Sequence, residues 1–141
     1  MIVVDTGPLV ALVSENDQHN KSCSAWFLET DPRQLIIPAP VLAEVCYHIG
    51  GKFGPEVEST FLEDLADGSY GTVVNVTTDD MRRMSVLVRQ YGDLSLGGTD
   101  ACVIAVAERL RIHSVATVDR RHFSVVRPAH VAAFDLLPVH L

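Results

Sequence analysis

Cysteine is scarce in this sequence, and its spacing excludes two common roles. The chain has three cysteines, Cys23, Cys46 and Cys102, an odd number with no two of them in a CxxC spacing. A disulfide framework needs paired cysteines, and a zinc site needs closely spaced thiolate ligands. We therefore expect reduced thiols that are buried as small apolar side chains, as in a cytoplasmic protein.

Long uncharged apolar runs are also absent. No such run approaches the roughly 18 residues that a membrane-spanning helix requires, so no membrane association is predicted. The first residues lack a basic region and carry Asp5 inside the apolar segment, so a secretory signal peptide is not predicted either. Because no internal repeat or low-complexity tract is visible, residues 1–141 are predicted to form a single domain.

Positive charge is scarce overall but unevenly distributed. The formal net charge is -7, which by itself disfavours a nucleic-acid partner. Eight of the eleven lysines and arginines nevertheless lie between Arg82 and Arg127, a stretch with only four acidic residues, Asp93, Asp100, Glu108 and Asp119. We expect this stretch to be able to contact a phosphate backbone locally.

Apolar segments of two kinds alternate along the chain. Short β-branched runs predict strands, and longer segments with apolar residues three to four positions apart predict helices. The predicted strands cover 1–4, 35–38, 71–76, 113–118 and 133–137, and the predicted helices cover 9–13, 20–30, 41–49, 55–65, 78–91 and 99–110. The helix at 41–49 is expected to end at Gly50 and Gly51. This alternation predicts an α/β fold with a parallel sheet, helices on both faces and strand order 3-2-1-4-5.

Four carboxylates occupy positions where burial would be costly for each alone. Asp5 and Asp119 follow predicted strands, while Glu44 and Asp100 lie in predicted helices that flank the same sheet edge. An ionised carboxylate in an apolar interior is strongly destabilising unless it is paired, so acids that converge from distant segments usually share a cation. Carboxylate oxygens are the ligands of hard divalent ions, and we predict Mg²⁺ or Mn²⁺ here.

The segments that carry these acids resemble motifs of one protein family. They are VVDTGPLVAL with Asp5, VLAEV with Glu44, GGTDACVIAVAERL with Asp100 and ATVDRRHF with Asp119. In this order and spacing they resemble the PIN-domain ribonucleases, and in particular the VapC toxins of bacterial type II toxin-antitoxin systems. The resemblance covers nearly the whole chain.

The resemblance implies both a fold and an activity. The fold is a PIN-like three-layer sandwich. The activity is that of a metal-dependent endoribonuclease, which hydrolyses RNA phosphodiester bonds with a metal-activated water and is held inactive by a cognate antitoxin protein. In this family Asp5, Glu44 and Asp100 would ligate Mg²⁺ or Mn²⁺, and Asp119 would complete the acidic site.

A homodimer is also implied, and the composition of the first two predicted helices favours it. These helices carry more apolar residues than one sheet face needs: Leu9, Val10, Leu12, Val13, Trp26, Phe27 and Leu28. An exposed apolar patch of this kind usually marks an interface.

Residues beside the acids are candidates for substrate binding. Thr6 and Thr117 could hydrogen-bond a carboxylate or a phosphate, or could be ordinary turn and strand residues. Arg120, Arg121 and His122 follow Asp119 directly, and either RNA phosphate contacts or a solvated surface turn would explain them.

Two other functions remain open from the sequence. A metal-dependent phosphatase also places acids at the ends of parallel strands, but it needs an acceptor aspartate in a DxD motif or a lysine at a strand end, and neither occurs. A non-catalytic RNA- or protein-binding PIN-like module would keep the fold and lose the chemistry. The presence of all four acids argues against that module.

Overall fold

The five strands of the protein form one parallel sheet. The computed structural model describes all 141 residues. The strands are β1 (Ile2–Val4), β2 (Leu35–Pro38), β3 (Thr72–Val74), β4 (Ser114–Ala116) and β5 (Asp135–Leu137). They pair in the order β3-β2-β1-β4-β5, and every pair is parallel. The predicted strand order 3-2-1-4-5 is therefore confirmed.

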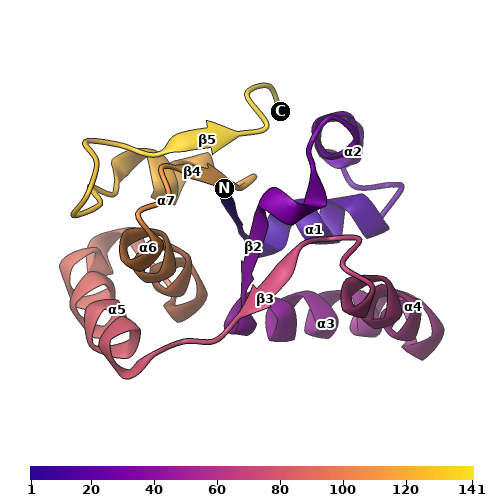
Figure 1. Ribbon diagram of the computed structural model, residues 1–141, viewed down its shortest axis with the longest axis horizontal. Coiled ribbons are helices and arrows are strands. Elements are labelled where there is room, and N and C mark those ends of the chain that lie inside the picture. Colours follow the sequence, from indigo (N-terminus) through magenta and orange to yellow (C-terminus); the bar gives the residue numbers. More distant parts are fainter.

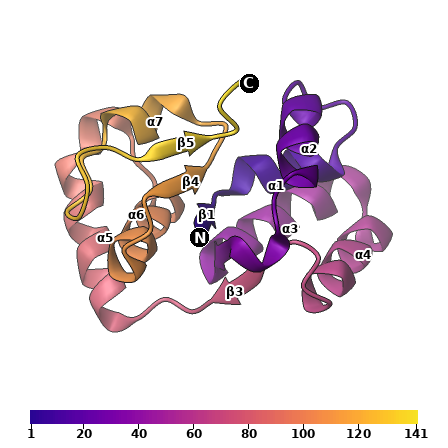
Figure 2. The ribbon, with the colours of Figure 1, turned by 45° about the horizontal axis from the view of Figure 1, so that its top comes forward.

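Seven α-helices connect the strands and lie on both sides of the sheet. They are α1 (Thr6–Val13), α2 (Asn20–Leu28), α3 (Ala39–Phe53), α4 (Pro55–Ala66), α5 (Thr78–Gln90), α6 (Gly98–Leu110) and α7 (Arg120–Val125). Figures 1 and 2 show α1 to α4 together on one side of the molecule and α5 to α7 on the other, with the central strands between them. This is the predicted three-layer arrangement. No helix combines the length and the apolar character that crossing a lipid bilayer requires.

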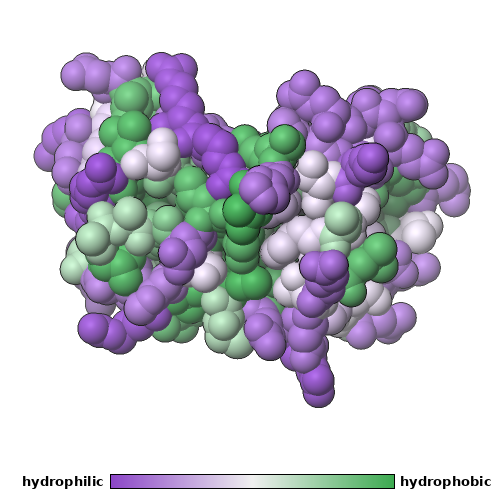
Figure 3. Space-filling model, turned by 90° about the horizontal axis from the view of Figure 1, so that it is seen from above, coloured by the Kyte–Doolittle hydropathy of each residue, from purple (hydrophilic) through white to green (hydrophobic).

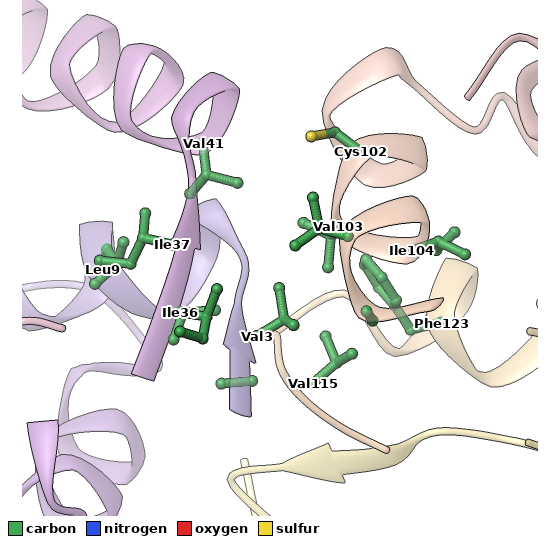
Figure 4. Packing of buried hydrophobic residues seen from close by; sticks show 14 of the residues in the cluster. Val3, Leu9, Ile36, Ile37, Val41, Cys102, Val103, Ile104, Val115 and Phe123 are labelled. Atoms are coloured by element: carbon green, nitrogen blue, oxygen red, sulfur yellow. The ribbon is translucent and has the colours of Figure 1, made fainter. Parts of the chain in front are cut away.

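Helix α6 contributes the most continuous part of the core. All seven residues from Ala101 to Ala107 are buried, which matches the apolar run ACVIAVA. In Figure 4, Val103 of α6 and Phe123 of α7 approach the sheet from one side, and Leu9 of α1 and Val41 of α3 approach it from the other. Burial of α6 on all sides fixes the position of its first turn, where Asp100 lies.

Several predicted boundaries were wrong, and each has a local cause. Helix α1 begins at Thr6 and not after Pro8, because Asp5 caps it and a proline in the first turn lacks only an N–H that has no helical partner. Helix α3 continues through both predicted stop glycines and ends at Gly54, whose φ of 85° favours glycine. At Gly50 a side chain would meet only the flexible end of Glu58 of α4, which can move aside, so neither predicted stop glycine is required for a turn.

Two further differences concern length and number. Strand β3 is shorter than predicted and pairs only with β2, as an edge strand. Helix α7 was not predicted at all, because six residues are too few to show a helical period. Its N-cap is Asp119, so one of the candidate acids also starts a helix.

Most apolar residues of the first two helices contribute to the core and not to a free surface. Leu9 is buried, and Val10, Leu12, Val13, Trp26 and Phe27 are partly buried against the core, whereas Leu28 is 85% exposed. Figure 3 views the end of the molecule that carries α2 and the C-terminus, where an apolar band lies between polar flanks. A groove between α2 and residues 137–140 lies at this end.

Candidate active site

The C-terminal ends of β1 and β4 bring two of the acids to the same edge of the sheet. Val4 pairs with Ala116 in the ladder, and the backbone N–H of Asp5 donates to the Ala116 carbonyl at 2.9 Å. After β1 the chain passes through α1 and α2 to β2, which lies on one side of β1. After β4, which lies on the other side of β1, it passes through α7 to β5, farther from β1. Such a switch in direction is where parallel α/β sheets place their ligands.

Asp5 is buried and held in one orientation. Its side chain accepts hydrogen bonds from the Thr6 backbone N–H and from the Thr117 hydroxyl, both at 2.8 Å, and the residue is 6% exposed. Burial raises the pKa of Asp5 from 3.8 to about 7, against the two hydrogen bonds, which lower it. The charges of Asp100 and Glu44 raise this pKa further, because both carboxylates lie near enough to repel it.

Thr117 joins the two acids that follow the strands. Its hydroxyl donates to Asp5 and accepts from the backbone N–H of Asp119 at 2.9 Å, and the residue is fully buried. Thr6 has a similar place on the other side, since its hydroxyl donates to the Glu44 carboxylate at 3.2 Å. Of the roles open to these threonines, the structure therefore shows contacts to carboxylates.

Asp100 enters the site from the first turn of α6. Its carboxylate accepts a hydrogen bond from the Gly97 backbone N–H at 3.1 Å. This contact caps α6, because the N-cap residue Gly97 has no side chain to do so. Burial raises the pKa of Asp100; the Gly97 N–H and His122 lower it, and the charges of Asp119 and Glu44 raise it. Each of the four acids thus acts electrostatically on at least one other.

His122 lies between two of the acids, a position that neither a phosphate contact nor a surface turn predicts. Its Nδ1 is 2.7 Å from Asp119 Oδ2 and 3.5 Å from Asp100 Oδ2. The Asp119 carboxylate also accepts the His122 backbone N–H at 3.1 Å as the cap of α7. The spacing of three residues after a capping aspartate is the signal that would have placed this ring beside the site.

The two arginines after Asp119 occupy different surroundings. The Arg120 guanidinium donates to the Pro138 carbonyl beyond β5, and burial lowers its pKa. Its predicted role as a free phosphate contact is therefore not supported by its position. Arg121 is exposed.

The basic stretch from Arg82 to Arg127 is largely engaged within the chain. Arg83 binds Glu108 through two hydrogen bonds, and Arg109 binds the buried Asp80. Further contacts join Arg82 to Asp79 and Arg127 to carbonyls of residues 124–126. Tertiary contacts therefore hold Arg83 and Arg109, and local contacts hold Arg82 and Arg127, so only part of this stretch remains free to contact a phosphate backbone.

The donor set suits a divalent cation. The four carboxylates lie close enough to act electrostatically on one another, although Asp5 and Glu44 lie outside the tight group that Asp100 and Asp119 form with His122. Oxygen ligands of this kind bind Mg²⁺ or Mn²⁺. The ligand atoms of Asp100, Asp119 and His122 lie within 4.8 Å of one another, and the buried Nδ1 of His122 has no hydrogen-bond partner.

Comparison with known proteins agrees with this fold. The family model of the PIN domain matches residues 2–127, and the chain therefore belongs to the PIN-domain family. Among curated proteins it is similar to Ribonuclease VapC26 of Mycobacterium tuberculosis strain H37Rv, with 27% identity over 137 residues, 97% of this chain and 100% of that protein. The resemblance inferred from the four motifs is confirmed.

Two solved structures share the fold. One is Mycobacterium tuberculosis VapC20, a sarcin-ricin loop cleaving toxin, with a TM-score of 0.74, 17% identity and coverage of 82% of this chain and 87% of that one. The other is FitAcB from Neisseria gonorrhoeae, with a TM-score of 0.67, 21% identity and full coverage of both chains. At these identities the likeness concerns the fold.

Proposed function

We propose that this protein is a metal-dependent endoribonuclease that acts as the toxin of a toxin-antitoxin pair. The observation that supports the proposal is the placement of Asp5, Glu44, Asp100 and Asp119 around Thr6, Thr117 and His122 at the C-terminal edge of the sheet. The similarity to a ribonuclease over nearly the full chain supports RNA as the substrate. A metal-dependent phosphatase lacks this support, and a non-catalytic module leaves the four converging acids without a role.

The residues present define how the reaction would be organised. Asp5, Glu44, Asp100 and Asp119 would hold Mg²⁺ or Mn²⁺, and the bound ion would lower the pKa of a coordinated water and neutralise charge on the scissile phosphate. Thr117 and Thr6 hold the carboxylates of Asp5 and Glu44 in place through their hydroxyls. No side-chain nucleophile is needed.

Partners follow from the same proposal. A cognate antitoxin protein would keep the enzyme inactive in the cytoplasm, and we infer a homodimer from the family resemblance. The groove between α2 and residues 137–140 and the exposed Leu28 leave apolar surface available for such contacts.

Cleavage of RNA with and without metal tests the proposed activity. The purified protein should open a circular single-stranded RNA with Mn²⁺ or Mg²⁺ and should leave it intact with EDTA, because opening a circle requires an internal cut. Cleavage that is equal in EDTA would overturn the metal-dependent mechanism. RNA binding without cleavage under any metal would favour the non-catalytic module.

Arg121 is the arginine beside Asp119 that remains free to contact RNA phosphate. In an Asp5→Asn background, which prevents turnover, Arg121→Ala should weaken RNA binding about equally for different sequences. It should also reduce the slope of log affinity against log salt by about one phosphate contact. Arg89→Ala, at another exposed arginine, is the matched control and should change the slope less. An identical slope for both variants would assign Arg121 to a solvated surface.

A further inference from the structure

The ring of His122 is oriented by a contact outside the acidic site. Its Nε2 is 2.8 Å from the backbone carbonyl oxygen of Leu94. Because a carbonyl oxygen only accepts hydrogen bonds, Nε2 must carry the hydrogen in this contact. The side chain is 14% exposed, and the backbone N–H of the same residue is bound by Asp119, so both the helix end and the ring are fixed.

This orientation points the second ring nitrogen, Nδ1, at two of the acids. In the neutral ring Nδ1 carries a lone pair, and it faces the Oδ2 atoms of Asp119 and Asp100, which are also electron-rich. The atom is buried and makes no hydrogen bond, although the Asp119 oxygen is only 2.7 Å away. The contact therefore calls for a positive charge, either a proton on Nδ1 that faces Asp119 or a cation bound by all three groups.

The distances from Nδ1 to the two carboxylate oxygens bracket those between adjacent ligands of one metal ion. Ligands bound about 2.1 Å from an ion lie roughly 3 to 3.4 Å apart when they are adjacent. The two distances from Nδ1, 2.7 and 3.5 Å, lie on either side of this range, and all three ligand atoms lie within 4.8 Å of one another. A histidine that ligates a metal commonly donates its other N–H to a backbone carbonyl, as His122 does to Leu94.

We infer that His122 is a metal ligand of this site through Nδ1, together with Asp100 and Asp119, and that the site therefore prefers a divalent transition ion such as Mn²⁺ to Mg²⁺. The inference rests on the proposed function and specifies its metal chemistry. Mg²⁺ is a hard ion that takes oxygen ligands, whereas an imidazole nitrogen strengthens binding of first-row transition ions. An all-carboxylate site would lack this preference.

Pulsed electron paramagnetic resonance on the Mn²⁺-loaded wild-type protein tests the ligand directly. A coordinated imidazole couples its ¹⁴N nucleus to the electron spin of Mn²⁺, so ¹⁴N modulation is expected. The modulation should disappear in His122→Gln, whose side-chain amide can still donate to the Leu94 carbonyl but offers no atom at the Nδ1 position. His48→Gln is the matched control, because His48 Nε2 lies 3.8 Å from Glu44 Oε1 in the same region. The modulation should persist in this control.

Cation affinities provide the second measurement. His122→Gln should weaken Mn²⁺ binding by about 10- to 100-fold and should change Mg²⁺ binding much less, with the fold checked by circular dichroism. Wild-type protein that binds Mn²⁺ without ¹⁴N modulation would overturn the inference and leave the proposed function standing, and this result needs no variant to fold. Wild-type protein that binds neither ion at millimolar concentration would contradict the proposed function itself.

Discussion

Asp5→Asn is expected to lower the rate of metal-dependent RNA cleavage by at least about 100-fold while the protein remains folded. The substitution removes one ligand charge from a site in which Asp5 is the most deeply buried of the four acids. Asparagine has nearly the same shape, so the core around β1 should be preserved. Cleavage of the circular RNA by wild type and variant, each with Mn²⁺ and with EDTA, measures the effect.

A charge-matched control separates loss of a ligand from loss of negative charge. Asp93→Asn makes the same chemical change at an exposed position before Leu94, and it should retain most of the wild-type rate. If Asp5→Asn cleaved as fast as Asp93→Asn in the presence of Mn²⁺, Asp5 would have no essential part in metal binding. Circular dichroism of both variants confirms that the comparison concerns folded protein.

The metal-free protein is expected to lose stability as the pH rises from about 4 to about 7, through the contribution of Asp5. The pKa of Asp5 is about 7 in the folded protein and ordinarily 3.8, so the folded state holds more protons across this interval. Protonation of Asp5 therefore stabilises the folded state. The contribution of Asp5 to the unfolding free energy is fully present below about pH 4 and is lost as the pH rises through 7. The total is on the order of 4 kcal/mol, and about 2 to 3 kcal/mol of it falls between pH 5 and 8.

Asp5→Asn isolates this contribution from other titrating groups. Urea unfolding in EDTA at pH 5 and pH 8 should show the variant gaining about 2 to 3 kcal/mol relative to wild type between the two pH values. Burial raises the pKa of Glu108, but its hydrogen bonds with Arg83 and Ala129 lower it overall, so this residue changes stability mainly below pH 5 and equally in both proteins. A difference in unfolding free energy that did not change with pH would show that Asp5 titrates normally.

Long patterned segments made the architecture predictable. The apolar run of α6 and the β-branched runs of β1, β2 and β4 indicate their structures locally, because such segments have few other ways to bury their side chains. Short elements were less predictable. The six residues of α7 show no period, and α3 ends at Gly54, which Gly50 and Gly51 do not reveal.

The candidate site was predictable in its acids but not in its remaining members. Asp5, Glu44, Asp100 and Asp119 lie in recognisable motifs, and the strand order brings the first and last of them to adjacent strands. The position of His122 depends on the direction of α7 and on the Leu94 carbonyl, which is 28 residues away. Likewise, Arg120 turns to Pro138, 18 residues further on. Contacts over such separations leave no local pattern.

By itself the sequence determined the family, the parallel α/β fold and the four acids, because these depend on apolar periodicity and on motifs that lie within short segments. The tertiary structure decided which charges remain free and which groups face the acids. Arg83 and Arg109 are paired with Glu108 and Asp80, and the ring of His122 lies between Asp100 and Asp119. The reason is physical: the pKa of a carboxyl and the availability of an arginine depend on burial and on neighbours within a few ångströms, which only the folded chain brings together.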